Sequence, residues 1–177
     1  MSTTATDHDE FADVFDDEDE SGHVDQYLLF KLGAELYGVP ITHVTEIIEM
    51  QPITSVPDMP VFIKGVINLR GNVVPVMDLR LRFNMEERPY DDRNCIIIAR
   101  IGTTSMGFII DTVAEVHDIP QSNIEPAPDF EDGTGKRHYI AGLGKVGDDV
   151  TILIDVKKIL AKSDLNTIEE GVSEIAQ

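Results

Sequence analysis

The sequence has only one cysteine in 177 residues, Cys95. A single thiol cannot form a disulfide within the chain, and a chain without disulfides is typical of a reducing compartment. Cys95 lies in the apolar run 95–99, where a buried structural thiol is expected. We therefore assign no chemistry to it.

Basic residues are also scarce, because 14 Lys and Arg face 33 Asp and Glu and give a formal net charge of -19 at pH 7. This charge repels other polyanions, which argues against nucleic acid or an acidic membrane surface as partner. The sequence has no apolar run long enough to cross a bilayer, and acids stand where a signal peptide has a basic start. A cytoplasmic protein is expected, and a protein partner can still recruit it to a membrane.

Motifs for catalysis and metal binding are missing. The five histidines lack metal-ligand spacing, none neighbours Cys95, and there is no phosphate loop, Gly-x-Ser-x-Gly or candidate triad. Residues 142–147 match Gly-x-Gly-x-x-Gly, but they lead to a strand at 150–154 instead of a helix, so hairpin glycines explain them. Asp78 and Asp155 precede apolar helical runs and are expected to be N-caps. The sequence predicts a binding protein without enzyme activity, cofactor or metal.

An acidic extension is the first feature that the chain does have. Residues 1–23 contain nine Asp and Glu and no Lys or Arg. Such a segment cannot offset the entropy cost of folding by burying apolar surface, so a disordered extension is predicted. Phe11 and Phe15 are four residues apart and suit a short helix that docks on a partner, although a solvated tail is the simpler interpretation.

Residues 63–79 are the most informative stretch. Two β-rich runs flank the Arg-Gly-Asn sequence at 70–72, where Gly and Asn favour the positive φ of a tight turn, so a hairpin with Arg70 at its tip is predicted. Pro75 has no amide hydrogen for a strand ladder and is typical of an edge strand or a bulge. Asp78 then begins a short helix.

Another hairpin and a helix are predicted earlier in the chain. Residues 27–41 contain two β-rich runs around a turn at 33–34, which predicts a hairpin. Val44, Ile47 and Ile48 follow at helical spacing behind a candidate N-cap at residue 42, which predicts a short helix.

The chain also contains an internal repeat. Residues 106–116 match 37–47 at a constant offset of 69, and residues 150–156 match 73–79 at an offset of 77. We predict two copies of one β-rich unit of about 65–75 residues, and short strands at this spacing favour small barrels. The copies differ at one turn, because the first copy has Arg-Gly-Asn at 70–72 and the second has Gly-Asp-Asp at 147–149, without an arginine. We infer that Arg70 has a role beyond the turn; a solvated loop arginine is the alternative.

Residues 63–79 resemble the segment that identifies the CheW family of bacterial chemotaxis adaptors, Gly-Val-x-Asn-Leu-Arg-Gly followed by Pro-Val-x-Asp-Leu. The likeness extends over about residues 25–165. It implies two small five-stranded barrels of SH3-like topology packed on each other, in agreement with the repeat. It also implies a non-enzymatic adaptor that couples membrane chemoreceptors to the regulatory domain of the histidine kinase CheA, at the inner face of the membrane.

The predicted fold class is therefore mainly β, with two SH3-like barrels, short helices and disordered tails. The extension at 1–23 precedes a domain at 24–165, whose two units lie at about 26–90 and 91–162 and can exchange strands. A polar C-terminal tail is predicted at 166–177.

The resemblance also implies a protein interface, made of receptor-facing and array-coupling residues and their counterparts in the second copy: Val44, Glu46, Arg70, Gly107, Val113 and Val116. Core packing is the alternative for the three valines, whereas Glu46 and Arg70 are poorly suited to burial. Two other functions stay open: a regulatory module of a larger kinase or receiver fusion, and a small β-barrel ligand-binding protein or enzyme of unknown substrate.

Overall fold

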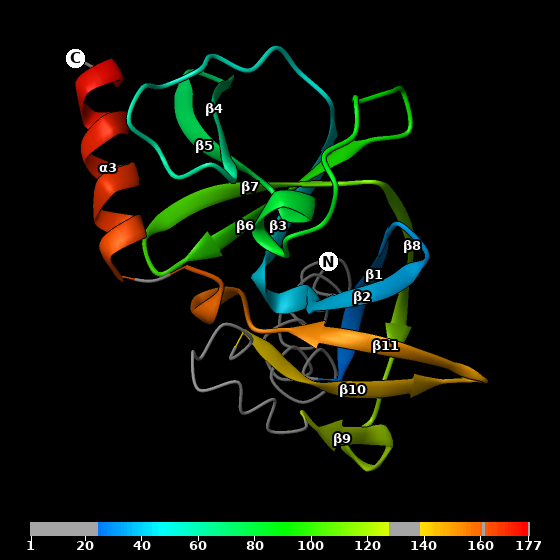
Figure 1. The fold of residues 1–177 in the computed structure, drawn as a ribbon. Helices are drawn as coiled ribbons and strands as arrows, with labels where there is room; N and C mark the ends of the chain where they lie inside the picture. The colour runs from blue at the N-terminus through cyan, green and yellow to red at the C-terminus, as the bar shows by residue number, and fades with distance from the viewer. Residues whose placement is uncertain (1–24, 128–138, 161, 177) are drawn as a thin grey trace, which may run out of the picture.

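The computed structural model describes residues 25–127, 139–160 and 162–176. Within them the chain forms two β-sheets, and a long helix lies beside one sheet (Figure 1). The acidic extension predicted over residues 1–23 lies outside the described residues. No helix in the described part of the chain is long and apolar enough to cross a bilayer.

The first sheet has six strands in the spatial order β8-β1-β2-β11-β10-β9. Neighbouring strands are antiparallel except β2 and β11, which are parallel. The bounds are β1 (Gln26–Leu32), β2 (Glu35–Pro40), β8 (Thr112–Asp118), β9 (Ile124–Pro126), β10 (Ile140–Val146) and β11 (Asp149–Ile154). The hairpin predicted at 27–41 is confirmed as β1 and β2.

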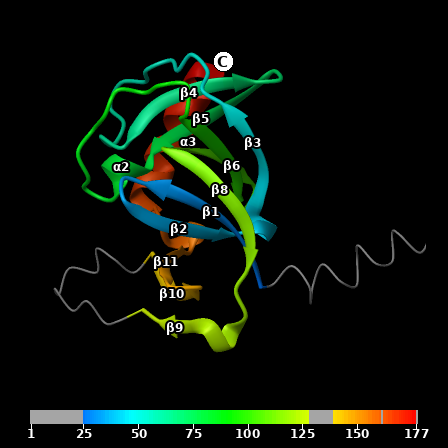
Figure 2. The same ribbon diagram turned by 90° about the vertical axis from the view of Figure 1, so that its right-hand side faces the viewer.

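The second sheet has five strands in the order β3-β6-β7-β5-β4, again with one parallel pair, β5 and β7. The bounds are β3 (Val44–Glu49), β4 (Ile63–Leu69), β5 (Asn72–Asp78), β6 (Cys95–Ile101) and β7 (Thr104–Ile110). The hairpin predicted within 63–79 is confirmed as β4 and β5. The turned view shows β3, β4, β5 and β6 above β9, β10 and β11 (Figure 2).

The helical elements are short except for the last one: η1 (Ile41–His43), α2 (Leu79–Arg82), η2 (Gln121–Asn123), η3 (Val156–Lys158) and α3 (Lys162–Ala176). Asp78 accepts hydrogen bonds from the backbone N–H groups of Arg80 and Leu81 at the start of α2. Asp155 accepts one from the N–H of Lys157 at the start of η3. Both predicted N-caps are confirmed.

The internal repeat is visible in the strand pairing. β1 and β2 correspond to β6 and β7, β3 to β8, and β4 and β5 to β10 and β11. The first hairpin of the first copy, β1 and β2, joins the second hairpin of the second copy through the parallel pair β2 and β11. The reverse combination forms the other sheet through the parallel pair β5 and β7. β3 pairs with β6, and β8 pairs with β1, so each of these strands also pairs with the other copy. Each sheet therefore draws its strands from both copies, and the mainly β fold class is confirmed.

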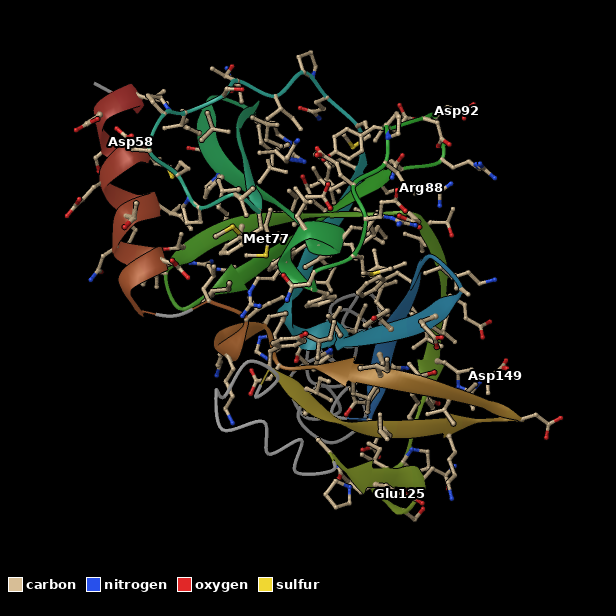
Figure 3. The ribbon with its side chains drawn as sticks, in the orientation of Figure 1. Asp58, Met77, Arg88, Asp92, Glu125 and Asp149 are labelled. Carbon is tan, nitrogen blue, oxygen red and sulfur yellow. The ribbon has the colours of Figure 1, made fainter. Side chains whose placement is uncertain are left out.

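Both faces of the central strands are buried. Leu28, Phe30 and Leu32 of β1 pack with Met77 and Phe108 of the other sheet in one shared core. The alternate residues of each sheet pack into a smaller core of that sheet alone. Figure 3 shows Met77 between the sheets. This double burial explains why the run at 95–99 is continuously apolar instead of alternating.

The helix predicted after residue 42 is wrong, because residues 44–49 form β3. Residue 42 lies inside η1, where no side chain caps the turn. Val44 and Ile48 are half-buried and Ile47 is exposed, which is the period of two of a strand. The β-branched side chains and the ladder to β6 favour the extended conformation.

Pro75 does not lie on an edge strand, because β5 is an interior strand between β4 and β7. The ladder from β5 to β7 begins only at Val76. Pro75 thus comes one residue before that ladder, and this placement makes a residue without an amide hydrogen compatible with an interior strand.

Most of the segment at 166–177, predicted as a polar tail, lies in α3, which continues to Ala176. Ile168 is fully buried in the shared core, and the helix packs against β5. A side chain at Gly171 would overlap the end of the Met59 side chain, so the helix lies very close to the loop before β4. Only part of this segment's surface is polar and exposed.

Candidate functional site

Arg70 and Glu46 form a two-pronged ion pair between the β4–β5 turn and β3. Arg70 Nη1 donates to Glu46 Oε1 at 2.9 Å, and Nη2 donates to Oε2 at 2.6 Å. The Arg70 side chain is 67% exposed and the Glu46 side chain 25% exposed. Such a parallel pair holds the planar guanidinium in a defined orientation. The arginine predicted at a hairpin tip is therefore exposed but fixed in position.

The turn beneath Arg70 has an unusual backbone. Arg70 and Gly71 have φ values of 52° and 87°, and Asn68 accepts a hydrogen bond from the Gly71 N–H at 2.8 Å. The prediction that Gly and Asn supply the positive φ is half right, since Asn72 already belongs to β5. In the second copy the position of Arg70 is taken by Gly147, with a φ of 60°.

A left-handed backbone costs a non-glycine residue about 1 kcal/mol or more. The second copy avoids this cost with glycine, whereas the first copy keeps an arginine. An unfavourable conformation that is retained at an exposed position points to a use for the side chain.

The ion pair lines a groove of about 670 Å³. Four parts of the fold form its walls: β3, the β4–β5 hairpin, the β6–β7 hairpin and α3. Apolar side chains at the groove alternate with hydroxyl and amide groups; the lining includes Leu69, Val74, Ile98, Val172, Thr45, Asn72, Thr103 and Ser173. Its ionisable lining residues are Glu46, Arg70 and Glu169, which include no nucleophile and base. This arrangement suits binding of protein side chains more than catalysis.

The other predicted interface residues are placed differently. Val44 is half-buried on β3, and Val113 is half-buried on β8; both pack against the shared core. Val116 lies on β8 in the first sheet and is 51% exposed. Gly107 is buried in β7, where a Cβ would press on the side chain of Ile96. Burial excludes Gly107 from direct contact with a partner, and close packing accounts for the glycine.

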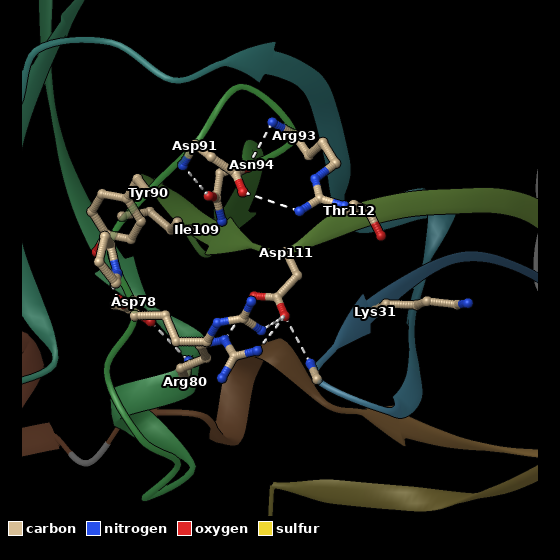
Figure 4. A pocket seen from close by; sticks show the side chains of 13 residues that line it. Lys31, Asp78, Arg80, Tyr90, Asp91, Arg93, Asn94, Ile109, Asp111 and Thr112 are labelled. Carbon is tan, nitrogen blue, oxygen red and sulfur yellow. Dashed lines mark hydrogen bonds and ion pairs between the residues drawn. The ribbon is translucent and has the colours of Figure 1, made fainter.

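A second, smaller hollow of about 200 Å³ lies where the two sheets meet (Figure 4). Asp111, between β7 and β8, accepts hydrogen bonds from Arg80 Nε at 2.7 Å and from the Gly33 N–H at 2.7 Å. Arg80 is buried, and its Nη2 donates a second hydrogen bond, to Asp111 Oδ2, at 2.5 Å. Burial opposes ionisation of Asp111, but the bonds from Arg80 and Gly33 outweigh it and lower the pKa of the carboxyl group.

The loop at 86–94 closes the same hollow. The Tyr90 hydroxyl donates to Oδ2 of buried Asp78 at 2.6 Å, and burial together with this bond raises the pKa of Tyr90. Asp91 is paired with Arg93. The acids that line this hollow therefore all have partners. These hydrogen bonds and ion pairs connect the loop to both sheets. Sequence reasoning missed the bond between Arg80 and Asp111, which are 31 residues apart.

The sequence predicts no metal site and no chemistry at its single thiol. Within residues 25–127, 139–160 and 162–176, no three His, Cys, Asp or Glu side chains form a metal-binding group. Cys95 is half-buried, and burial raises the pKa of its thiol, so it is a poor nucleophile. The glycines at 142–147 lie in the β10–β11 hairpin, as predicted.

Comparison with known proteins gives consistent matches. The CheW-like domain family matches residues 26–164. "Chemotaxis protein CheW" of Klebsiella aerogenes is 36% identical over 144 residues, which cover 81% of this chain and 86% of that protein. "Chemotaxis protein CheW" of Helicobacter pylori is 32% identical over 145 residues, with 82% and 87% covered. The crystal structure of scaffolding protein TtCheW from Thermoanaerobacter tengcongensis superposes with a TM-score of 0.72 at 35% identity, covering 79% of this chain and 94% of that chain.

Proposed function

We propose, because the chain belongs to the CheW family of non-enzymatic chemotaxis adaptors, that it joins a membrane chemoreceptor to the histidine kinase CheA. The family has two SH3-like β domains. In this chain Glu46 and Arg70 are the proposed contact residues. The helical tip of the receptor binds at the groove beside this pair. The regulatory domain of CheA binds another barrel end. Receptor binding brings the adaptor to the inner face of the membrane.

The observation that supports this proposal most is the state of Arg70. It is exposed, has an unfavourable φ that the second copy avoids, and is oriented by Glu46 before any partner arrives. Pre-orientation reduces the entropy lost on binding, and arginine is over-represented among interface residues with large effects on affinity. Val44 on the same strand, and Val113 and Val116 on β8, are proposed as additional apolar contacts. Val116 has the exposure that such a contact needs.

Calorimetric titration of the adaptor with a receptor signalling fragment and with the CheA regulatory domain tests the proposal. We expect both proteins to bind the wild type. Exchanging the charges with Glu46→Arg and Arg70→Glu together keeps an ion pair but reverses its orientation, so receptor binding should be lost while kinase binding persists. If the exchanged pair binds the receptor like the wild type, Arg70 acts only within the fold. If neither protein binds the wild type, the proposal is wrong.

A further inference from the structure

We propose that α3 forms the second wall of the receptor site, and that its acidic surface selects a partner helix with an apolar stripe flanked by basic residues. This inference rests on the proposed function, because the groove also contains Glu46 and Arg70. It adds a specificity-determining element, α3, and a chemical description of the partner.

The side chains of α3 are arranged to face the groove. Ile168 is buried in the shared core, and Val172, one turn later, packs partly against that core and lines the groove. Glu169 and Ser173 are each one position further along and line its rim. Residues four apart lie on one side of a helix, so α3 presents an apolar stripe at the groove with a polar edge beside it. This pattern suits recognition of an amphipathic helix.

The helix is held in place by contacts with a loop and with a strand. The side chains of Val56 and Met59 approach Gly171 so closely that a Cβ there would overlap Met59. Thr104 in β7 donates a hydrogen bond to Glu169 at 3.3 Å. Contacts with the loop before β4, with β5 and with β7 thus fix α3 as a wall before a partner binds, which lowers the ordering cost of binding.

The charges around the groove indicate what the partner carries. Glu46 and Arg70 neutralise each other, whereas Glu169 has only the neutral hydroxyl of Thr104 as a hydrogen-bond partner among the described contacts. α3 carries four acids, and its one basic residue, Lys162, is at its first position. A basic side chain on the partner would face this wall favourably, whereas an acidic one would be repelled.

Two variants on the same helix test the inference. Glu169→Lys changes a residue that lines the groove, and Glu170→Lys makes the same change at an exposed residue outside this lining. Calorimetric titration with a receptor signalling fragment should show a loss of affinity of about tenfold for Glu169→Lys and less than about threefold for Glu170→Lys. The loss should shrink as salt is added, since exposed charges are screened. Equal losses for both variants would mean that only the overall charge matters and would overturn the inference.

Glu169→Gln completes the test. It keeps the shape of the side chain but removes its charge, so it should give a smaller loss of affinity than Glu169→Lys. If Arg70→Ala loses binding while all α3 variants bind like the wild type, the role of α3 is wrong and the proposed function stands. If the wild type does not bind the fragment, both are wrong.

Discussion

The side chain of Arg70 makes a favourable ion pair, whereas its backbone has an unfavourable positive φ. In the bidentate pair with Glu46 the arginine side chain is exposed, and pairs at the surface contribute about 0–1 kcal/mol to stability. The positive φ of Arg70 costs a similar amount. Because these two effects nearly cancel, the arginine contributes little net free energy to folding.

We therefore expect Arg70→Gly to separate binding from stability. Glycine takes the positive φ without strain, so the free energy of unfolding measured in urea should change by less than about 1 kcal/mol. Receptor affinity should fall about thirtyfold, which corresponds to about 2 kcal/mol, a typical loss at an interface arginine. Asp148→Ala, at the equivalent turn of the second copy, should alter neither quantity. Unfolding of Arg70→Gly under native conditions would show that Arg70 is a structural residue.

Among the elements, α3 contributes to the core although its sequence is mostly polar. Its composition is mostly polar, yet Ile168 completes the shared core. Removing a fully buried isoleucine side chain typically costs about 2–5 kcal/mol.

Ile168→Ala should accordingly lower the free energy of unfolding by several kcal/mol, measured by urea denaturation. Ile175→Ala on the same helix is the control, because Ile175 is 41% exposed and its removal should cost less than about 0.5 kcal/mol. Similar small effects for both variants would mean that α3 detaches easily from the sheet.

The elements also show what the sequence can and cannot predict. The hairpins and the caps at Asp78 and Asp155 depend on neighbours within a few residues, and they were predicted correctly. β3 was not, because its extended form depends on a ladder to β6 about fifty residues away. The bond between Arg70 and Glu46 joins residues 24 apart and could not be read from spacing. For α3 a signal existed: Ile168, Val172 and Ile175 have helical spacing.

At the scale of the whole molecule, the shared core joins the two sheets. It is larger than the core of either sheet alone and includes residues from both sheets and from α3. Asp111 adds a polar connection, because it binds both Gly33 of the β1–β2 turn and Arg80 of α2. Neither sheet can be removed without exposing the apolar face of the other.

The protein should therefore unfold in a single thermal transition. Differential scanning calorimetry should give a calorimetric enthalpy equal to the van't Hoff enthalpy. The variant Asp111→Ala leaves the buried Arg80 without its charge partner, and we expect it to lower the midpoint while the transition remains single. Two separate transitions in the wild type would contradict the idea of one cooperative core.

The exchange of strands between the repeat copies also determines the order in which the fold can form during synthesis. The second sheet is made entirely from residues 44–110, so all its strands are synthesised before β8, β9, β10 and β11 of the first sheet. β1 and β2 are synthesised first but must wait for β8, β10 and β11. Domains generally fold as units while the chain emerges. β1 and β2 are thus the first strands of the described chain to be synthesised and among the last to reach all their native neighbours, so their apolar side chains stay uncovered until the shared core forms.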